Sequence, residues 1–430
     1  MRFRTLAVAA FMGALCSAAL AQGPEEGRAE AFRRLRAEGV VAINAGNLES
    51  ASASLAQADR LIPNHPGLTL LRAKLAAARD DLPAATALLD RYARFGLTAD
   101  LADDEVLQRV TVENDFVPVA RRLAANAQPL GRLEVVGSLD GPFLAEGVAW
   151  DPASRRLLIS GVHGRSIMAV SGGGKLTRFL DPRADVDGVM GLAIDAPRNL
   201  LWAASAGLPQ AKDLPEGRRG TAALLKIDLR SGRLLSRFDP PAGSAPRAFG
   251  DIALGADGAV YVSDAFAGEI LRLSPGAHRL EQLVAPGSLA SPQGLVVAPD
   301  GQRLVVSDYV TGLHVVQLST GVVTPLAAPD DASLIGVDGL VRDGDSLIAI
   351  QNGVSPHRVV RLTMNAGFSA VERWEVLAAN LPQMEEPTTG LVHEDELVFV
   401  ARSQWTDFGQ AGALLRDPPG PAIIARLKLR

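Results

Sequence analysis

The stretch ADGAVYVSD at residues 256–264 returns 43 residues later as PDGQRLVVSD at residues 299–308. In both copies an Asp-Gly pair, which is typical of a tight hairpin turn, precedes a run rich in β-branched residues that ends in Ser-Asp. Two more strand-like runs follow the first copy, at residues 269–273 and 279–284. Four strands in about 40 to 50 residues are the pattern of one propeller blade.

Blades can be counted along the chain in two ways. Six innermost strands are predicted to begin near Gly147, Gly191, Asp251, Gly294, Gly339 and Gly390. Six outermost strands are predicted at residues 132–139, 175–180, 233–238, 278–284, 322–326 and 372–377. The first outer strand precedes the first blade, however, and the chain ends on a third strand at residues 423–429. We therefore expect the N-terminal strand to complete the last blade of a six-bladed β-propeller at residues 131–430, which leaves no open sheet edge there.

Residues 22–130 have a helical period and are rich in Ala, Leu and Arg. A shift of 34 residues superposes Gly39 on Ala73 and Leu55 on Leu89. This pattern resembles tetratricopeptide repeats, in which small residues let paired helices approach and leucines fill the seam between them. A third, less regular copy is expected at residues 101–123. The fold class is therefore mainly β, a six-bladed β-propeller preceded by an α-helical tetratricopeptide-like repeat domain.

The first helix of each predicted pair offers polar side chains for a partner. They are Arg33, Arg36, Asn44 and, one repeat later, Arg72. Because guanidinium groups hold carboxylates bidentately, these residues favour an acidic peptide or the C-terminal carboxylate of a protein partner. The alternative is that the arginines form a solvated face and that the repeats only cap or tether the propeller.

Composition restricts the class of protein. The chain is 47% hydrophobic and 21% charged, and its formal net charge is −5. These values are typical of a folded globular protein with a large core. A mildly acidic chain without a block of Lys or Arg argues against a nucleic-acid partner, because phosphates require a basic surface.

Residues 1–21 have the pattern of an export signal. Basic residues at 1–4 precede an apolar stretch at 6–20, and Ala19 and Ala21 suit a cleavage site before Gln22. We therefore expect a periplasmic or secreted protein without a membrane span. The only cysteine, Cys16, lies within this signal, so the mature chain is expected to have no thiol. Lipid attachment at Cys16 is the alternative, although Gly13 stands where lipoprotein signals have leucine.

Side chains at the starts of the innermost strands are expected to converge at one mouth of the central channel. They belong to Glu146, Met190, Asp251, Gln293, Asp338 and Thr389. Converging carboxylates repel one another unless a cation or protons neutralise them. Oxygen ligands of this kind suit a hard divalent ion such as calcium, magnesium or manganese.

Several short motifs resemble the gluconolactonase and regucalcin (senescence marker protein) family. LAEGVAWDP at residues 144–152, with GVHGRSI at 161–167, is similar to that family's first blade. SPQGL at 291–295 and GVDG at 336–339 fall where the family has its later metal-site motifs. The resemblance spans residues 132–430.

This resemblance implies a metal site and a reaction. The implied cofactor is a divalent cation, with calcium the first choice and magnesium, manganese or zinc as alternatives. Glu146, Gln293 and Asp338 would hold it, and Gln293 stands where the family has asparagine. Asp338 would also be the catalytic base, and Asp251 would contact a substrate that is a sugar lactone or related ester. His163, at the end of the second strand of the first blade, is a further candidate for substrate contact. Its alternative role is that of a surface turn residue.

Other polar residues and catalytic motifs give alternatives to this site. Asp264, Asp308 and Asn352 follow second strands at equivalent places, where a short polar side chain usually caps the turn. No Gly-x-Ser-x-Gly elbow is present, so any hydrolysis is expected to be metal-assisted. A non-catalytic scaffold, with helical repeats and propeller both serving as binding surfaces, is the competing hypothesis.

Overall fold

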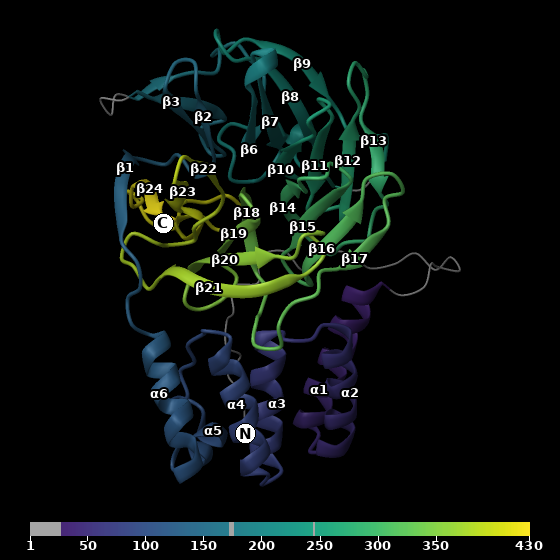
Figure 1. Ribbon diagram of the computed structural model, residues 1–430, viewed down its shortest axis with the longest axis vertical. Helices are drawn as coiled ribbons and strands as arrows, with labels where there is room; N and C mark the ends of the chain where they lie inside the picture. The colour runs from purple at the N-terminus through teal and green to yellow at the C-terminus, as the bar shows by residue number, and fades with distance from the viewer. Residues whose placement is uncertain (1–26, 172–175, 244–245) are drawn as a thin grey trace.

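The computed structural model describes residues 27–171, 176–243 and 246–430. The predicted export signal at residues 1–21 lies outside them. The strands form six four-stranded antiparallel sheets, arranged around one centre, and six helices lie beside them (Figure 1). The predicted fold class, a mainly β six-bladed propeller with an N-terminal helical region, is confirmed.

The first five blades each use four consecutive strands, innermost first. Blade one contains β2 (Ala145–Asp151), β3 (Arg156–Gly161), β4 (Ser166–Val170) and β5 (Leu176–Arg178). Blade two contains β6 (Gly188–Asp195), β7 (Leu200–Ala206), β8 (Ala222–Asp228) and β9 (Leu234–Phe238). Blade three contains β10 (Phe249–Leu254), β11 (Val260–Asp264), β12 (Glu269–Leu273) and β13 (Glu281–Val284). Blade four contains β14 (Pro292–Val297), β15 (Arg303–Asp308), β16 (Gly312–Gln317) and β17 (Val323–Pro325). Blade five contains β18 (Val337–Asp343), β19 (Ser346–Gln351), β20 (Arg358–Met364) and β21 (Val371–Ala379).

The sixth blade is built from both ends of the propeller sequence. Its strand order is β22 (Gly390–His393), β23 (Glu396–Arg402), β24 (Ala422–Lys428) and β1 (Leu133–Leu139). Strand β1 pairs antiparallel with β24, with Leu133 opposite Leu427 and Leu139 opposite Ala422. The predicted clasp between the N-terminal strand and the last blade is therefore confirmed.

The described helices are α1 (Arg28–Asn44), α2 (Leu48–Leu61), α3 (Pro66–Ala78), α4 (Leu82–Arg94), α5 (Glu105–Thr111) and α6 (Val117–Asn126). The first four form two pairs, α1 with α2 and α3 with α4, and α5 and α6 pack against the second pair. In the first pair, a Cβ on Gly39 would lie 2.7 Å from Leu55 Cγ, so glycine is what lets α1 approach α2. Leu55 and Leu89 are buried in the seams of the first and second pairs, as the 34-residue period predicted. Among the described helices, none is both long enough and apolar enough to cross a bilayer.

The helices are attached to one side of the ring, next to β20 and β21 of the fifth blade (Figure 1). Arg358 of β20 is buried at this junction, where it donates hydrogen bonds to the Phe95 carbonyl and, at 2.6 Å, to Gln351 Oε1. Burial lowers the pKa of Arg358 to about 9. Asn380 Nδ2 donates to the Asn126 carbonyl at 2.8 Å. Buried polar contacts of this kind hold the helical region against the propeller.

Candidate functional site

The starts of the innermost strands share a local irregularity. Pairing with the second strand is broken between Ala145 and Val148 in the first blade and between Val337 and Leu340 in the fifth. The same break occurs in the second, third and fourth blades. A β-bulge turns side chains away from the regular alternation of a strand. Each bulge contains one of the predicted channel residues, including Glu146 and Asp338.

Close packing of these bulges makes a continuous ring. A Cβ on Gly147 would lie 2.7 Å from the backbone carbonyl oxygen of Met190, and one on Gly294 would lie 2.8 Å from the backbone carbonyl oxygen of Asp338. A Cβ on Gly191 would meet the Gly250 oxygen at 2.7 Å, and one on Gly339 would lie 2.7 Å from Thr389 Cα. Glycine therefore follows a ring residue wherever the next blade's backbone is too close for any side chain.

Serines at the ends of second strands satisfy the backbone groups that the bulges leave unpaired. Ser160 Oγ donates to the Met190 carbonyl at 2.5 Å, and Ser307 Oγ donates to the Asp338 carbonyl at 3.1 Å. Ser263 Oγ accepts a hydrogen bond from the Asp251 amide at 2.9 Å. The Ser-Gly and Ser-Asp pairs that end these strands were visible in the sequence, but the role of Ser160 and Ser307 in joining neighbouring blades was not predicted.

Four buried carboxyl groups around the ring have raised pKa values. Burial raises the pKa of Glu146 well above its ordinary range, and the negative charges of Asp338, Asp251 and Glu386 raise it further. Burial, followed by the charge of Asp338, raises the pKa of Asp251 and of Glu386 to about 7 each. Burial also raises the pKa of Asp338 to about 6. Among the described residues no arginine or lysine lowers these pKa values, and the one basic side chain close to the group is His357, whose Nε2 lies 3.9 Å from Glu386 Oε1.

Glu146 and Asp338 each accept a short hydrogen bond from a side chain. Trp405 Nε1 donates to Glu146 Oε2 at 2.7 Å, and Asn352 Nδ2 donates to Asp338 Oδ2 at 2.7 Å. Asn352 Nδ2 also donates to the Pro387 carbonyl at 2.9 Å. Asn352 Oδ1 is buried and has no hydrogen-bond partner among the described residues. An acceptor oxygen therefore remains free next to Asp338.

The structure corrects the prediction that Asn352 caps a turn. Asp264 Oδ1 accepts from the amide of Phe266, and Asp308 Oδ1 accepts from the amide of Val310, so both cap turns as expected. Asn352 is instead joined to Asp338 across the entrance of the fifth blade. The reason is chemical, because an amide nitrogen can donate to a carboxylate whereas an aspartate at the same place would repel it.

Gln293 fills the space beside Gly250. Its Nε2 donates to Ser291 Oγ at 3.1 Å, and its Oε1 lies 3.4 Å from where a Cβ on Gly250 would be. The longer side chain thus occupies room that glycine leaves in the neighbouring blade. No group of three or more His, Cys, Asp or Glu side chains in the described part of the chain is gathered closely enough to hold a metal ion. Metal binding by Glu146, Gln293 and Asp338 therefore stays a prediction.

Asp251 lies at the channel itself. Its Oδ1 accepts from the Ile252 amide at 3.0 Å, and its Oδ2 lies 3.5 Å from the Thr389 hydroxyl of the sixth blade. Asp251 and Thr389 also border a cavity of about 340 Å³, which is otherwise lined by the later residues of the innermost strands. A small polar molecule at the ring mouth would therefore meet Asp251 where the channel begins.

His163 packs within the loops that surround the ring. Its Nδ1 lies 2.7 Å from the Gln210 carbonyl, and its ring centroid lies 5.0 Å from that of Phe408. These contacts suit the turn role that was its alternative. Substrate contact by His163 stays a prediction.

The predicted partner-binding residues divide into two groups. Arg33, Arg36 and Asn44 are exposed on α1. Arg72 on α3 is half-buried and forms an ion pair with Asp59 of α2. Arg72 therefore stabilises the helix packing, and only the α1 residues are open to a partner.

Three residues of the ring mouth were missed by sequence analysis. Trp405 comes from the long connection between β23 and β24, and Glu386 precedes the innermost strand of the sixth blade. Burial, followed by the charges of Asp338 and Glu386, raises the pKa of Tyr309. The Glu385-Glu386-Pro387 sequence was a usable signal for Glu386, because it stands just before an innermost strand. Nothing in the sequence singled out Trp405 or Tyr309.

Comparison with protein-family models gives no match, and no curated protein matches the sequence. Solved structures do resemble the propeller. A gluconolactonase from Xanthomonas campestris is 19% identical over 71% of this chain and 93% of its own, with a TM-score of 0.48. A calcium-binding regucalcin from Agrobacterium tumefaciens is 18% identical over 68% of this chain and 93% of its own, with a TM-score of 0.48. Virginiamycin B lyase from Staphylococcus aureus is 16% identical over 70% of this chain and 99% of its own, with a TM-score of 0.45.

Proposed function

We propose that the ring mouth binds a divalent cation through Glu146 and Asp338 and that the protein hydrolyses a lactone or related ester. One observation carries this proposal. Burial raises the pKa of Glu146, Asp251, Asp338 and Glu386, the charge of Asp338 raises the pKa of the other three further, and no lysine or arginine of the described residues pairs with any of the four. A set of acid groups that is costly to ionise without a counter-charge is stabilised when a cation supplies that charge.

The donor atoms suit a hard ion. Trp405 and Asn352 each occupy one oxygen of Glu146 and Asp338, and the second oxygen of each carboxylate accepts no hydrogen bond from a described residue. The buried, unpartnered Asn352 Oδ1 is a further oxygen beside Asp338. Carboxylate and amide oxygens are preferred by calcium, magnesium and manganese, and calcium tolerates irregular coordination best. Gln293 remains a candidate third ligand if its side chain turns away from Ser291.

The protein's own residues would divide the work of hydrolysis. Asp338, oriented by Asn352, would hold a water molecule and take its proton as the water oxygen bonds to the carbonyl carbon. The same proton would then pass to the alkoxide as the ring C–O bond breaks. Asp251, at the channel entrance, would bind hydroxyl groups of the substrate. A bound divalent cation would supply Lewis-acid polarisation of the carbonyl oxygen.

A lactone panel tests the activity. Purified protein is incubated with aldono-1,4- and aldono-1,5-lactones in EDTA, calcium, magnesium, manganese or zinc, and acid release is followed. We expect metal-dependent hydrolysis that falls at least a hundredfold in Asp338→Asn and stays unchanged in Asp103→Asn, an exposed carboxylate of the helical region. Hydrolysis that is equal in Asp338→Asn and wild type, or absent with every metal and lactone, would contradict the proposal.

Cation binding is tested separately by thermal unfolding. A cation that binds only the folded state stabilises it by about 2.7 kcal/mol at a hundred times its dissociation constant. The melting temperature of wild type should therefore rise with at least one of the four metals. Glu146→Gln/Asp338→Asn should lose this rise, whereas Asp103→Asn should keep it. A metal site without lactone hydrolysis would leave a binding role for the ring mouth.

The second candidate function is a scaffold that binds a partner through the helical region. Arg33, Arg36, Val40 and Asn44 follow one another on one face of α1, all four are exposed, and neither arginine forms an ion pair with a described residue. Such a face suits an acidic peptide. Fluorescence anisotropy of a labelled acidic peptide with a free C-terminus should show binding that Arg33→Ala/Arg36→Ala abolishes. Equal binding by both proteins, or none, would exclude this role.

We also propose that the mature protein is exported. The proposal rests on the basic, apolar and small-residue pattern of residues 1–21. Fractionation of cells that produce the full chain should place a product beginning near Gln22 in the periplasm or medium. A full-length product retained in the cytoplasm would contradict it.

A further inference from the structure

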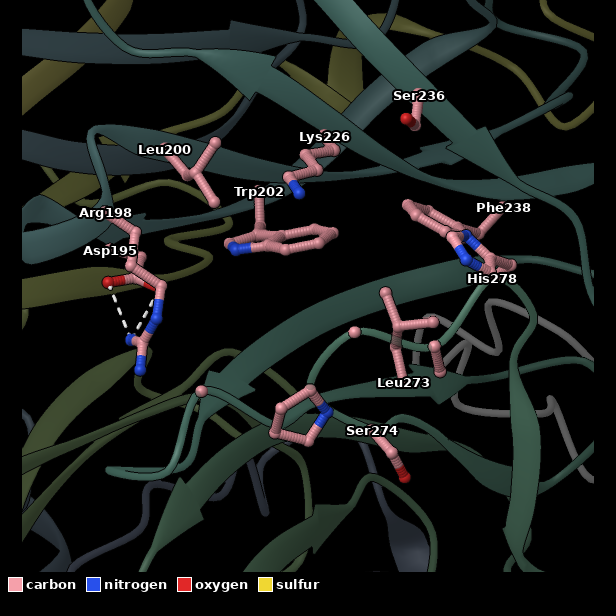
Figure 2. Close-up of a pocket in the computed structure, with 14 residues that line it drawn as sticks. Asp195, Arg198, Leu200, Trp202, Lys226, Ser236, Phe238, Leu273, Ser274 and His278 are labelled. Carbon is pink, nitrogen blue, oxygen red and sulfur yellow. Dashed lines mark hydrogen bonds and ion pairs between the residues drawn. The ribbon is translucent and has the colours of Figure 1, made fainter.

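A cleft separate from the ring mouth lies between the second and third blades. It has a volume of about 290 Å³. The second blade contributes side chains from β7, β8 and β9, and the third contributes the end of β12 and the turn after it (Figure 2). Strand β6 carries Met190 of the ring near its start and Asp195 of the cleft at its end. The cleft and the ring mouth therefore lie at opposite ends of the same strand.

One wall of the cleft is a row of side chains across the second blade. Trp202 is opposite Lys226, and Lys226 is opposite Ser236, in the pairing of β7, β8 and β9. Lys226 Nζ lies 5.7 Å from the centre of the Trp202 ring. Phe238 extends this wall, with its ring centroid 6.0 Å from that of Trp202. Figure 2 shows the indole and the phenyl ring along one side of the cleft, with Lys226 beside the indole.

The charges of the cleft are unbalanced. Asp195 is already paired with Arg198, whose Nη1 lies 3.0 and 3.2 Å from its two carboxylate oxygens. Arg198 also donates to the Asp257 carbonyl of the third blade, so this pair joins the two blades. Lys226 is half-buried and has no carboxylate within ion-pair distance in the described parts of the chain. The ammonium group of Lys226 is therefore the free charge of the cleft.

Trp202 adds an unused hydrogen-bond donor. Its side chain is only 5% exposed, and its Nε1 is buried without a hydrogen-bond partner among the described residues. A buried indole N–H usually finds an acceptor, because leaving it unpaired costs about 1–3 kcal/mol. The cleft thus combines two aromatic faces, an uncompensated cation and a free donor, and the opposite wall adds the buried side chain of Leu273.

We propose that this cleft binds a small aromatic carboxylate, with its ring against Trp202 and Phe238 and its carboxylate paired with Lys226. The charge of Lys226 selects an anion, and the aromatic and aliphatic walls select a flat apolar body. The volume suits a molecule of one or two fused rings. The site is independent of the cation proposed at the ring mouth.

Calorimetric titration of the full chain with 2-naphthoate tests this site. EDTA is present throughout, so that the carboxylate cannot reach a cation at the ring mouth. We expect 2-naphthoate to bind at least tenfold more tightly than 2-naphthylmethanol, which has the same rings and no charge. This comparison needs no variant. Equal affinities for the two compounds, or no binding of 2-naphthoate at millimolar concentration, would overturn the proposal.

Two lysine variants locate the binding. Lys226→Met keeps the apolar stem and removes the charge, and it should weaken 2-naphthoate binding at least tenfold. Lys226→Arg should bind within about threefold of wild type. Lys212→Met removes an exposed lysine of the loop beside His163 and serves as the matched control, with unchanged affinity. An unchanged affinity in Lys226→Met would place the ligand elsewhere and overturn the proposal.

Discussion

The hydroxyl of Thr388 donates a 2.7 Å hydrogen bond to the backbone carbonyl of Glu146, across 242 positions of the sequence. It joins the innermost strands of the sixth and first blades at the level of the acidic ring. The pairing of β1 with β24 joins the same two parts of the chain at the outer edge of the sixth blade. The position of Glu146 therefore depends on closure of the ring at both its centre and its rim.

Removal of β24 should open the ring. A chain that ends at Arg416 lacks the partner of both β1 and β23, so two strands are left with unpaired edges. We expect loss of soluble protein, measured as the soluble fraction after expression, whereas removal of Arg430 alone should have no such effect. A soluble truncated chain with an unchanged melting temperature would show that the clasp is dispensable.

Gly339→Ala should disturb the ring directly. The added methyl would lie 2.7 Å from Thr389 Cα, and neither backbone can move without shifting its blade. Overpacking of this kind typically costs about 1–3 kcal/mol in the free energy of unfolding. Gly217→Ala is the control, because a Cβ on Gly217 would have no atom within 4 Å. Equal denaturation midpoints for the two variants in urea would disprove close packing at the ring.

The free energy of unfolding of the metal-free protein should depend on pH through Asp251. Its pKa is raised from 3.8 to about 7, so the folded state binds a proton that the unfolded state releases between these values. Stability contributed by this group is therefore present at low pH and is lost as the pH rises through about 7, by up to about 1.4 kcal/mol per pH unit. In EDTA, Asp251→Asn should be more stable than wild type by on the order of 1–2 kcal/mol at pH 8.

The same comparison should show a smaller difference at pH 5, where the Asp251 carboxyl group of the folded state is still protonated. The free energy of unfolding of both proteins is measured in urea at pH 5, 6.5 and 8. Calcium should remove the lower stability of wild type at pH 8. Asp300→Asn, at an exposed turn, provides the control and should show no such trend. A constant difference between Asp251→Asn and wild type at all three pH values would rule out the raised pKa.

Trp405→Phe should weaken cation binding in a pH-dependent way. The indole N–H lowers the pKa of Glu146, so its removal raises that pKa further and leaves more of the carboxyl protonated at neutral pH. Hydrogen bonds to charged groups contribute about 1.5–3 kcal/mol, which corresponds to at least a tenfold weaker calcium affinity at pH 7. The deficit should shrink at pH 8.5.

Trp374→Phe is the matched control for this calcium titration. Trp374 Nε1 also donates to a carboxylate, Asp331 Oδ1 at 3.0 Å, but at the junction with the helices rather than at the ring. We expect its calcium affinity to equal that of wild type. The same loss of affinity in both tryptophan variants would indicate a general effect on stability and not a role for Trp405 at Glu146.

The propeller was predictable because its blades repeat. The Asp-Gly pairs at residues 257–258 and 300–301 mark equivalent hairpins, and the surplus strand at the N-terminus required a clasp. The ring positions were suggested by a related pattern. Glu146, Met190, Gln293 and Asp338 each precede a glycine, and that glycine is needed because the next blade's backbone approaches too closely for a Cβ.

Contacts made by irregular segments could not be predicted from the sequence. Trp405 reaches Glu146 from the long, irregular connection between β23 and β24, so the strand period gave it no position. The aromatic cleft depends on the side-by-side placement of Trp202 and the turn after β12, which belong to different blades. The pairing of Arg72 with Asp59 likewise required the relative rotation of α2 and α3, which a repeat of 34 residues does not define.

The clasp also orders events during synthesis of the chain. Strand β1 leaves the ribosome before any blade, whereas its partner β24 lies at residues 422–428 and is made last. The sixth blade therefore cannot form before residues 422–428 have been made, and β1 must wait unpaired until then. A nascent chain arrested before residue 422 would hold five complete blades at most, and Thr388 would lack a finished blade from which to hold Glu146.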